Sequence, residues 1–200
     1  MDQHAAQRSF VLGPQLHALG SAYAGGAGLV QVARPELEAL RDALGETIHL
    51  GVYRNGEVLE VASAGGLQPV SVSLGAGRRD PAHCTALGKV LLAALEPERL
   101  EAFLRRPLER RTPRSLARKA DLLKAIAATR NQGYGTDVEE LAADMCCVAV
   151  PVQDPAGRIV AALSIAMPKS RYRAERVAGW VKALSAAAER IGGRLRPDRA

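Results

Sequence analysis

The 200-residue sequence contains few aromatic residues. They make up 4% of the chain, with one tryptophan and two phenylalanines among them. The core must therefore be built from leucine, valine, isoleucine and alanine, and side chains on which bases or sugars stack are scarce. This scarcity argues against a domain that binds single-stranded nucleic acids.

Long apolar runs and a cysteine framework are also missing. No run of about 18 apolar residues and no secretory signal is present, so we expect a cytoplasmic protein without a membrane partner. The three cysteines, of which Cys146 and Cys147 are adjacent, cannot form a disulfide framework and lack the C-x-x-C spacing of zinc or redox sites. We therefore expect reduced thiols, no metal and no cofactor.

Charge is spread along the chain. The 27 basic side chains are spread among the 21 acidic ones, so we interpret the formal net charge of +6 as that of a solvated surface. Residues 105–119 are an exception, because they hold seven basic residues and one acid, Glu109. We expect a surface loop there, and a direct contact with nucleic-acid phosphates is the alternative.

Hydrophobic periodicity predicts an α+β fold with one central antiparallel sheet flanked by helices. Helical spacing is found at 14–24, 29–44, 85–94, from 97 onward, at 120–130 and at 174–195, and the glycines at 25, 26 and 28 are expected to end the first of these helices. Strand patterns are found at 48–52, 58–61, 70–74, 145–153 and 159–166. Asn55-Gly56 and residues 154–157 are turn signals that join two of the strand pairs as hairpins.

The segment His83-Cys84-Thr85-Ala86-Leu87-Gly88-Lys89 follows a strand and opens a helix. Backbone amides at such a helix start, here those of Ala86 and Leu87, together with the positive end of the helix dipole, can hold a carboxylate. A structural turn in which Gly88 allows close packing is an equally good interpretation.

Four further residues combine polarity with an apolar setting. The carboxylates between 134 and 140 are typical of a solvated turn, except that Asp137 lies in an expected strand and can point inward. Cys146 and Cys147 alternate to opposite faces of a buried strand, and core packing is the plain interpretation of both. Ser164 lies within an apolar strand, so its hydroxyl must find a partner in the backbone or in a bound molecule.

The order and spacing of several segments resemble the effector-binding region of the IclR family of bacterial transcription regulators, over nearly the whole chain. The matching segments are Phe10-Val11-Leu12-Gly13, Leu19-Gly20, Gly45-Glu46-Thr47, His83 to Lys89, Gly133-Tyr134 with Asp137, Glu139 and Glu140, Cys147-Val148-Ala149-Val150-Pro151-Val152, and Ala162-Leu163-Ser164-Ile165 before Pro168 and Arg171.

The resemblance implies a GAF-like fold with a pocket on one face of the sheet, where a small organic acid binds and biases a dimer or a dimer of dimers on DNA. By position, the family's effector contacts fall on Ala86, Leu87, Asp137, Cys147 and Ser164. A second serine expected two residues after Ser164 is replaced by Ala166. The resemblance therefore implies an effector less polar than a two- or three-carbon keto acid.

Members of this family carry a winged helix-turn-helix of about 60 residues before the effector domain. Only its last strand and the linker helix fit residues 1–28, so we expect residues 29–200 to form the effector-binding domain and the chain to be a fragment or a short form. DNA contact is then made by the missing segment, and repression and activation are both open.

The expected function is thus ligand sensing without catalysis. The alternative is a cysteine-dependent small-molecule enzyme on a GAF-like scaffold, for example a sulfoxide reductase that uses Cys84 with Cys146 or Cys147. Such chemistry needs an exposed thiolate of low pKa and a resolving cysteine within reach.

Overall fold

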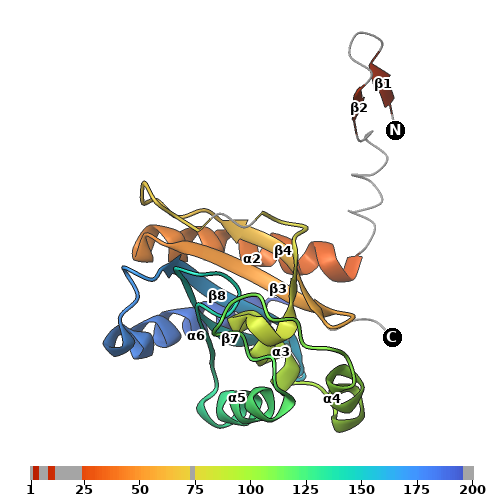
Figure 1. Ribbon diagram of the computed structural model, residues 1–200. Helices are drawn as coiled ribbons and strands as arrows, with labels where there is room; N and C mark the ends of the chain where they lie inside the picture. Colours follow the sequence, from red (N-terminus) through yellow and green to blue (C-terminus); the bar gives the residue numbers. More distant parts are fainter. Residues whose placement is uncertain (1, 5–8, 12–23, 73–74, 196–200) are drawn as a thin grey trace.

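The computed structural model describes residues 2–4, 9–11, 24–72 and 75–195, with side chains from residue 28 onward (Figure 1). Its main elements are α2 (Ala24–Leu44), β3 (Thr47–Arg54), β4 (Glu57–Ala64), β5 (Arg79–Pro81), η1 (Ala82–Cys84), α3 (Ala86–Ala93), α4 (Pro97–Leu104), α5 (Lys119–Gln132), β6 (Gly135–Val138), β7 (Met145–Gln153), β8 (Ile159–Pro168), η2 (Ala174–Arg176) and α6 (Val177–Gly193). Two further strands, β1 (Asp2–His4) and β2 (Ser9–Val11), pair with each other.

The main sheet has six strands in the order β5-β4-β3-β8-β7-β6, and all neighbours are antiparallel. The α+β prediction is therefore confirmed. The β3–β4 hairpin closes at Asn55 and Gly56, whose φ angles of 51° and 88° are those of a two-residue turn that fits the twist of its strands. β3 and β8 join the two halves of the sheet.

Helices cover both faces of the sheet, as Figure 1 shows. α2 packs over β3 and β4 on one face, and α6 packs beside it over β7 and β8, whose large side chains there include Val148, Leu163 and Ile165. α3, α4 and α5 contribute to the cluster on the other face. There the same two strands present small residues, namely Cys147, Ala149, Ala162 and Ala166. These small side chains leave room beneath α3.

The predicted strand at 70–74 is wrong for the part that the structure describes. Residues 70–72 form no strand, and Val70 is 67% exposed. The edge of β4 pairs instead with β5 at Arg79–Pro81. Without a neighbouring strand, the alternating apolar residues have no ladder to join, and the backbone carbonyl of Val70 accepts from Arg171.

The prediction that glycines at 25, 26 and 28 end a helix is also wrong, because all three lie inside α2. A glycine costs a helix only about 1 kcal/mol relative to alanine. Burial of Leu29, Ala33, Leu37 and Leu40 along one face of α2 outweighs that cost. The proposed boundary between residues 28 and 29 falls within this helix, and the expected helix at 14–24 lies outside the described residues except for Ala24.

A β-bulge interrupts the pairing of β3 with β4. The register shifts between Leu50 and Gly51, so that Leu50 pairs with Ala62 and Gly51 pairs with Glu60. The extra residue in β4 changes which face its side chains occupy. Ala62 and Ala64 pack toward α2 and α6, whereas Val58 packs on the side of α3.

Candidate functional site

One cavity lies between the start of α3 and the sheet. It is lined by His49, Val58, Glu60, Asp80, Thr85, Ala86, Leu87, Asp137, Leu141, Cys147 and Ser164. The structure therefore brings all five residues of the predicted effector site, which come from four separate segments, around one space. The cavity volume is about 30 Å³, enough for about two water molecules at 10–15 Å³ each.

The first turn of α3 lines this cavity with Ala86 and Leu87. Thr85 is the N-cap, and its Oγ1 accepts from the amide of Gly88 at 2.8 Å, while its carbonyl accepts from the backbone amide of Lys89. The amides of Ala86 and Leu87 remain as first-turn donors without an intrahelical acceptor. A Cβ on Gly88 would lie 2.0 Å from the Ala82 carbonyl oxygen, so the predicted close packing at Gly88 is confirmed.

Asp137 is fully buried in β6, beside Cys147 of β7. Its Oδ1 accepts from the amide of Glu140 at 2.7 Å, and its Oδ2 has no hydrogen-bond partner among the described residues. Burial, assisted by the nearby charge of Glu140, raises the pKa of Asp137 to about 7. Near neutral pH this carboxyl can therefore carry a proton and donate it in a hydrogen bond.

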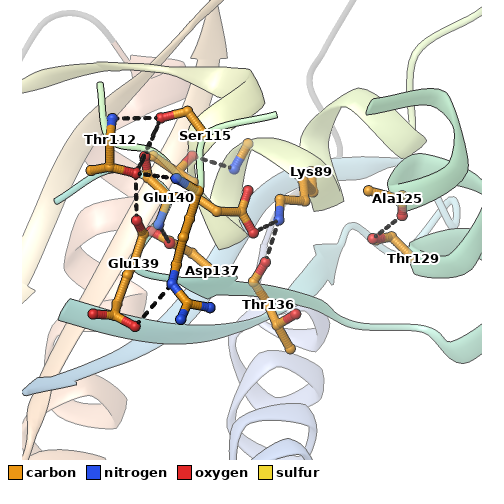
Figure 2. A network of polar contacts seen from close by, with 12 residues as sticks. Lys89, Thr112, Ser115, Ala125, Thr129, Thr136, Asp137, Glu139 and Glu140 are labelled. Atoms are coloured by element: carbon orange, nitrogen blue, oxygen red, sulfur yellow. Dashed lines mark hydrogen bonds and ion pairs between the residues drawn. The ribbon is translucent and has the colours of Figure 1, made fainter. Parts of the chain in front are cut away.

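A polar network surrounds the turn that follows Asp137, and Figure 2 shows it from close by. Lys89 Nζ donates to Glu140 Oε1 and to the carbonyl of Thr136, both at 2.5 Å. Burial raises the pKa of Glu140, against the effect of the Lys89 charge. The prediction of a solvated turn is therefore wrong for Glu140, which is 9% exposed and held by a lysine from α3.

The same turn holds the arginine-rich segment in place. Residues 105–118, between α4 and α5, contain no helix and no strand, which confirms the predicted loop except at Lys119, the first residue of α5. Thr112 Oγ1 donates to the carbonyl of Glu139 at 2.6 Å, and Ser115 Oγ donates to that of Glu140 at 2.7 Å. Through Glu140, the loop is connected to the carboxyl of Asp137 at the cavity.

The three thiols are buried and free. Cys146 and Cys147 pack into the clusters on opposite faces of the sheet, as predicted. Burial raises the pKa of Cys84 to about 12, that of Cys146 to about 11, and that of Cys147 well above its usual value. These environments do not supply the exposed thiolate that a cysteine-dependent enzyme needs.

Three ionisable cavity residues, His49, Glu60 and Asp80, were missed by the sequence analysis. His49 and Glu60 are 2% and 4% exposed, and Nδ1 of His49 lies 2.9 Å from Oε1 of Glu60. Asp80 is held by Arg78, whose Nε donates to both carboxylate oxygens at 2.9 Å. Alternation with Ile48 and Leu50 places His49 on the face opposite to these apolar residues, a signal that could have identified it.

The described part of the chain shows neither a membrane span nor a metal cluster. No helix among them is both long and apolar enough to span a membrane. They also contain no group of three or more histidine, cysteine or acidic side chains placed to hold a metal ion.

Comparison with known proteins gives consistent matches. A family model described as "Bacterial transcriptional regulator IclR C-terminal" matches residues 21–192. The HTH-type transcriptional regulator KdgR of Escherichia coli K12 is 31% identical over 194 residues, which cover 96% of this chain and 74% of KdgR.

Two solved structures are similar to the fold. The crystal structure of the C-terminal domain of E. coli KdgR superposes with a TM-score of 0.76 at 33% identity, covering 84% of this chain and 98% of that one. An IclR homologue from Microbacterium hydrocarbonoxydans, solved in complex with 4-hydroxybenzoate, has a TM-score of 0.83 at 29% identity and covers 92% of this chain and 75% of its own.

Proposed function

The chain belongs to the IclR family of bacterial transcriptional regulators and matches its C-terminal region, and from this we propose that it senses a small organic acid, which binds in the cavity below α3. The observation that carries the proposal is the convergence of the first turn of α3 with Asp137, Cys147 and Ser164 on one cavity. The related protein bound to 4-hydroxybenzoate supports an organic acid as the ligand class.

The effector carboxylate accepts from the amides of Ala86 and Leu87, where the helix dipole favours a negative charge. Protonated Asp137 and the hydroxyl of Ser164 add donors, and Cys147 forms part of the wall. Ala166 has only a methyl side chain, which is buried in an apolar cluster, so it adds no further polar group. The effector is therefore less polar than a two- or three-carbon keto acid.

Binding must change the shape of the domain. A cavity of about 30 Å³ is far below the roughly 300 Å³ of an ordinary ligand pocket, so the lining side chains have to move apart. Asp137 is hydrogen-bonded to Glu140, to which the 105–118 loop is attached. Movement of Asp137 is therefore transmitted through Glu140 to the 105–118 loop at the protein surface.

The regulator acts as a homodimer or a dimer of dimers in the cytoplasm, where the chromosome lies. An effector that binds two assembly states unequally shifts the equilibrium between them, and so alters the affinity for a symmetric operator. Contact with DNA belongs to the winged helix-turn-helix of the complete regulator.

Calorimetric titration with a panel of aliphatic and aromatic carboxylic acids tests the effector site. Ser164→Ala should weaken binding of the tightest-binding acid by about 0.5–1.5 kcal/mol, roughly two- to tenfold in Kd, because one hydrogen bond is lost. Cys147→Ser should alter the order of preferred acids before it alters stability, because it adds a strong hydrogen-bonding group to the wall.

The pH dependence of binding gives an independent readout. Asp137 must be protonated beside the effector carboxylate, so affinity should fall as pH rises through about 7. Glu140, Lys89 and Cys147 lie next to the Asp137 carboxyl and can titrate as well. Asp137→Asn should abolish the fall in effector affinity, which assigns that fall to Asp137 and not to its neighbours. If folded Ser164→Ala, Cys147→Ser and Asp137→Asn proteins all bind every acid as the wild type does, the effector site lies elsewhere.

A further inference from the structure

The pair formed by His49 and Glu60 is buried in the cavity wall without the hydrogen bonds that burial requires. Although Nδ1 of His49 and Oε1 of Glu60 lie 2.9 Å apart, their orientation is not that of a hydrogen bond. Both ring nitrogens and Oε1 lack a hydrogen-bond partner among the described residues. Unsatisfied buried groups of this kind are costly and call for an explanation.

The pair lies on the β3–β4 side of the cavity, whereas Asp137 lies on the β6 side. Ala86 is next to β6, because a Cβ on Gly135 would lie 2.7 Å from its carbonyl oxygen. Asp137 is also in β6, at one edge of the sheet, whereas Glu60 is in β4, beyond β7, β8 and β3. The cavity thus has two polar ends, and Ser164, opposite His49 in the β3–β8 register, lies between them.

The backbone is shaped so that Glu60 faces this space. Without the bulge in β4, Glu60 would share a face with Ala62 and Ala64, which pack toward α2 and α6. The extra residue places Glu60 with Val58 on the cavity side instead. Bulges are frequent where a sheet must re-aim a functional side chain.

We propose that the His49–Glu60 pair binds a hydroxyl group of the effector, which makes the effector a hydroxycarboxylic acid. This inference rests on the proposed function, because it takes the carboxylate to lie at α3. A hydroxyl group donates one hydrogen bond and accepts others, so it can donate to the Glu60 carboxylate while it accepts from an N–H of His49. A ketone oxygen can only accept, and an ammonium group can only donate, so each leaves one member of the pair unsatisfied.

Calorimetry with matched pairs of acids tests this inference. Three pairs of increasing length are suitable, namely glycolate and acetate, 4-hydroxybutyrate and butyrate, and 4-hydroxybenzoate and benzoate. In at least one pair the hydroxy acid should bind the wild type at least about tenfold more tightly, because the deoxy acid leaves buried groups unpaired. Glu60→Gln and His49→Gln should reduce this preference to less than about threefold, with little change in the affinity for the deoxy acid.

Glu57→Gln is the matched control, because it makes the same chemical change in the same strand, at a residue whose side chain is 45% exposed and paired with Arg79. It should keep the full preference. Since a buried substitution can prevent folding, nitrogen NMR of the histidine rings in the wild type provides a second readout, in which a hydroxy acid shifts a ring signal that its deoxy partner leaves unchanged.

The outcomes separate the two proposals. If the wild type binds hydroxy and deoxy acids equally, and Ser164→Ala weakens both, the effector site stands and the role of His49 and Glu60 is overturned. Full retention of the preference in folded Glu60→Gln protein overturns it as well. If no carboxylic acid binds at all, the proposed function fails and the hydroxyl site fails with it.

Discussion

At the scale of single residues, burial decides the chemistry of the ionisable groups around α3. Asp137 and Glu140 both have a raised pKa, yet only Glu140 has a lysine as partner. Asp137 has to rely on a proton or on a ligand to satisfy its free oxygen. Because the folded chain buries this carboxyl, the free energy of unfolding should depend on whether Asp137 is protonated.

Asp137→Asn should change how stability depends on pH. Between pH 3.8 and about 7 the folded chain retains a proton on Asp137 that the unfolded chain has released, so the free energy of unfolding falls as pH rises through this window. The asparagine removes this contribution while its Oδ1 can still accept from Glu140. In urea unfolding, the free energy of unfolding of the variant minus that of the wild type should be more positive at about pH 8 than at about pH 5.

Asp42→Asn removes a carboxylate whose side chain is 60% exposed and serves as the control for charge alone. If the free energies of unfolding of the Asp137→Asn variant and the wild type differ by the same amount at both pH values, Asp137 is ionised in the folded chain between pH 3.8 and about 7.

The thiols should be unreactive in the folded protein. A pKa of about 12 in place of 9.0 lowers the thiolate fraction of Cys84 about a thousandfold, and all three side chains are at most 8% exposed. An aromatic disulfide reagent should therefore label them at the rate of unfolding, and promptly after denaturation. Rapid labelling of one thiol in the native state would instead support the cysteine-dependent enzyme.

At the scale of elements, the sequence predicted those structures whose signals are local. Asn55-Gly56 and the turn at 154–157 each determine their own backbone, and the structure confirms both. The strand at 70–74 failed because alternation does not say whether a neighbouring strand is available. Glu60 was missed because a bulge, which depends on pairing with β3, shifted its face.

The effector residues were found by resemblance rather than by pattern. Periodicity placed Asp137, Cys147 and Ser164 in strands and suggested that their polarity needed a partner. It could not tell that β6, β7 and β8 would bring them around one cavity, since strand order is a long-range property. Their presence in one cavity is observed, whereas their contact with an effector stays a prediction.

Gly88→Ala should damage the junction between η1 and α3. The new Cβ would lie 2.0 Å from the carbonyl oxygen of Ala82, which is backbone and cannot rotate away. Overpacking of this severity costs about 3 kcal/mol or more, measurable as a lower midpoint in chemical denaturation. A small effect would mean that η1 moves easily relative to α3.

Gly179→Ala in α6 is the matched control, because no atom lies within 4 Å of its Cβ position. It should be neutral or should stabilise the fold by about 0.4–1 kcal/mol, since alanine restricts the unfolded chain.

At the scale of the whole molecule, the two faces of the sheet have different roles. The face under α2 and α6 is filled by large aliphatic side chains, whereas the face under α3 combines small residues with buried ionisable groups. The second face is therefore the one that can change shape at low cost. The 105–118 loop is attached to it through side-chain hydrogen bonds to the backbone of Glu139 and Glu140.

Ser115→Ala should release this loop. Ser115 Oγ accepts from the amides of Arg111 and Thr112 and donates to the carbonyl of Glu140, so its loss leaves buried groups unsatisfied at a cost of about 1–3 kcal/mol. Trypsin cleaves after arginine, and the loop contains several. Cleavage within it should become about tenfold faster or more, because cleavage follows the population of the open loop.

Ser185→Ala makes the same change on α6, away from the loop, and should leave the rate of tryptic cleavage unchanged.

Cleavage of the wild type and of Ser115→Ala, with and without a bound acid, also tests whether the cavity and the loop are coupled. Because Asp137 Oδ1 accepts from the Glu140 amide, an acid that orders Asp137 should slow cleavage of the wild-type loop. The protection should be smaller in Ser115→Ala, where the loop keeps only the longer bond of 3.3 Å from Thr112 Oγ1 to the Glu140 carbonyl. Equal protection of both proteins would show that the effector signal does not pass through Ser115.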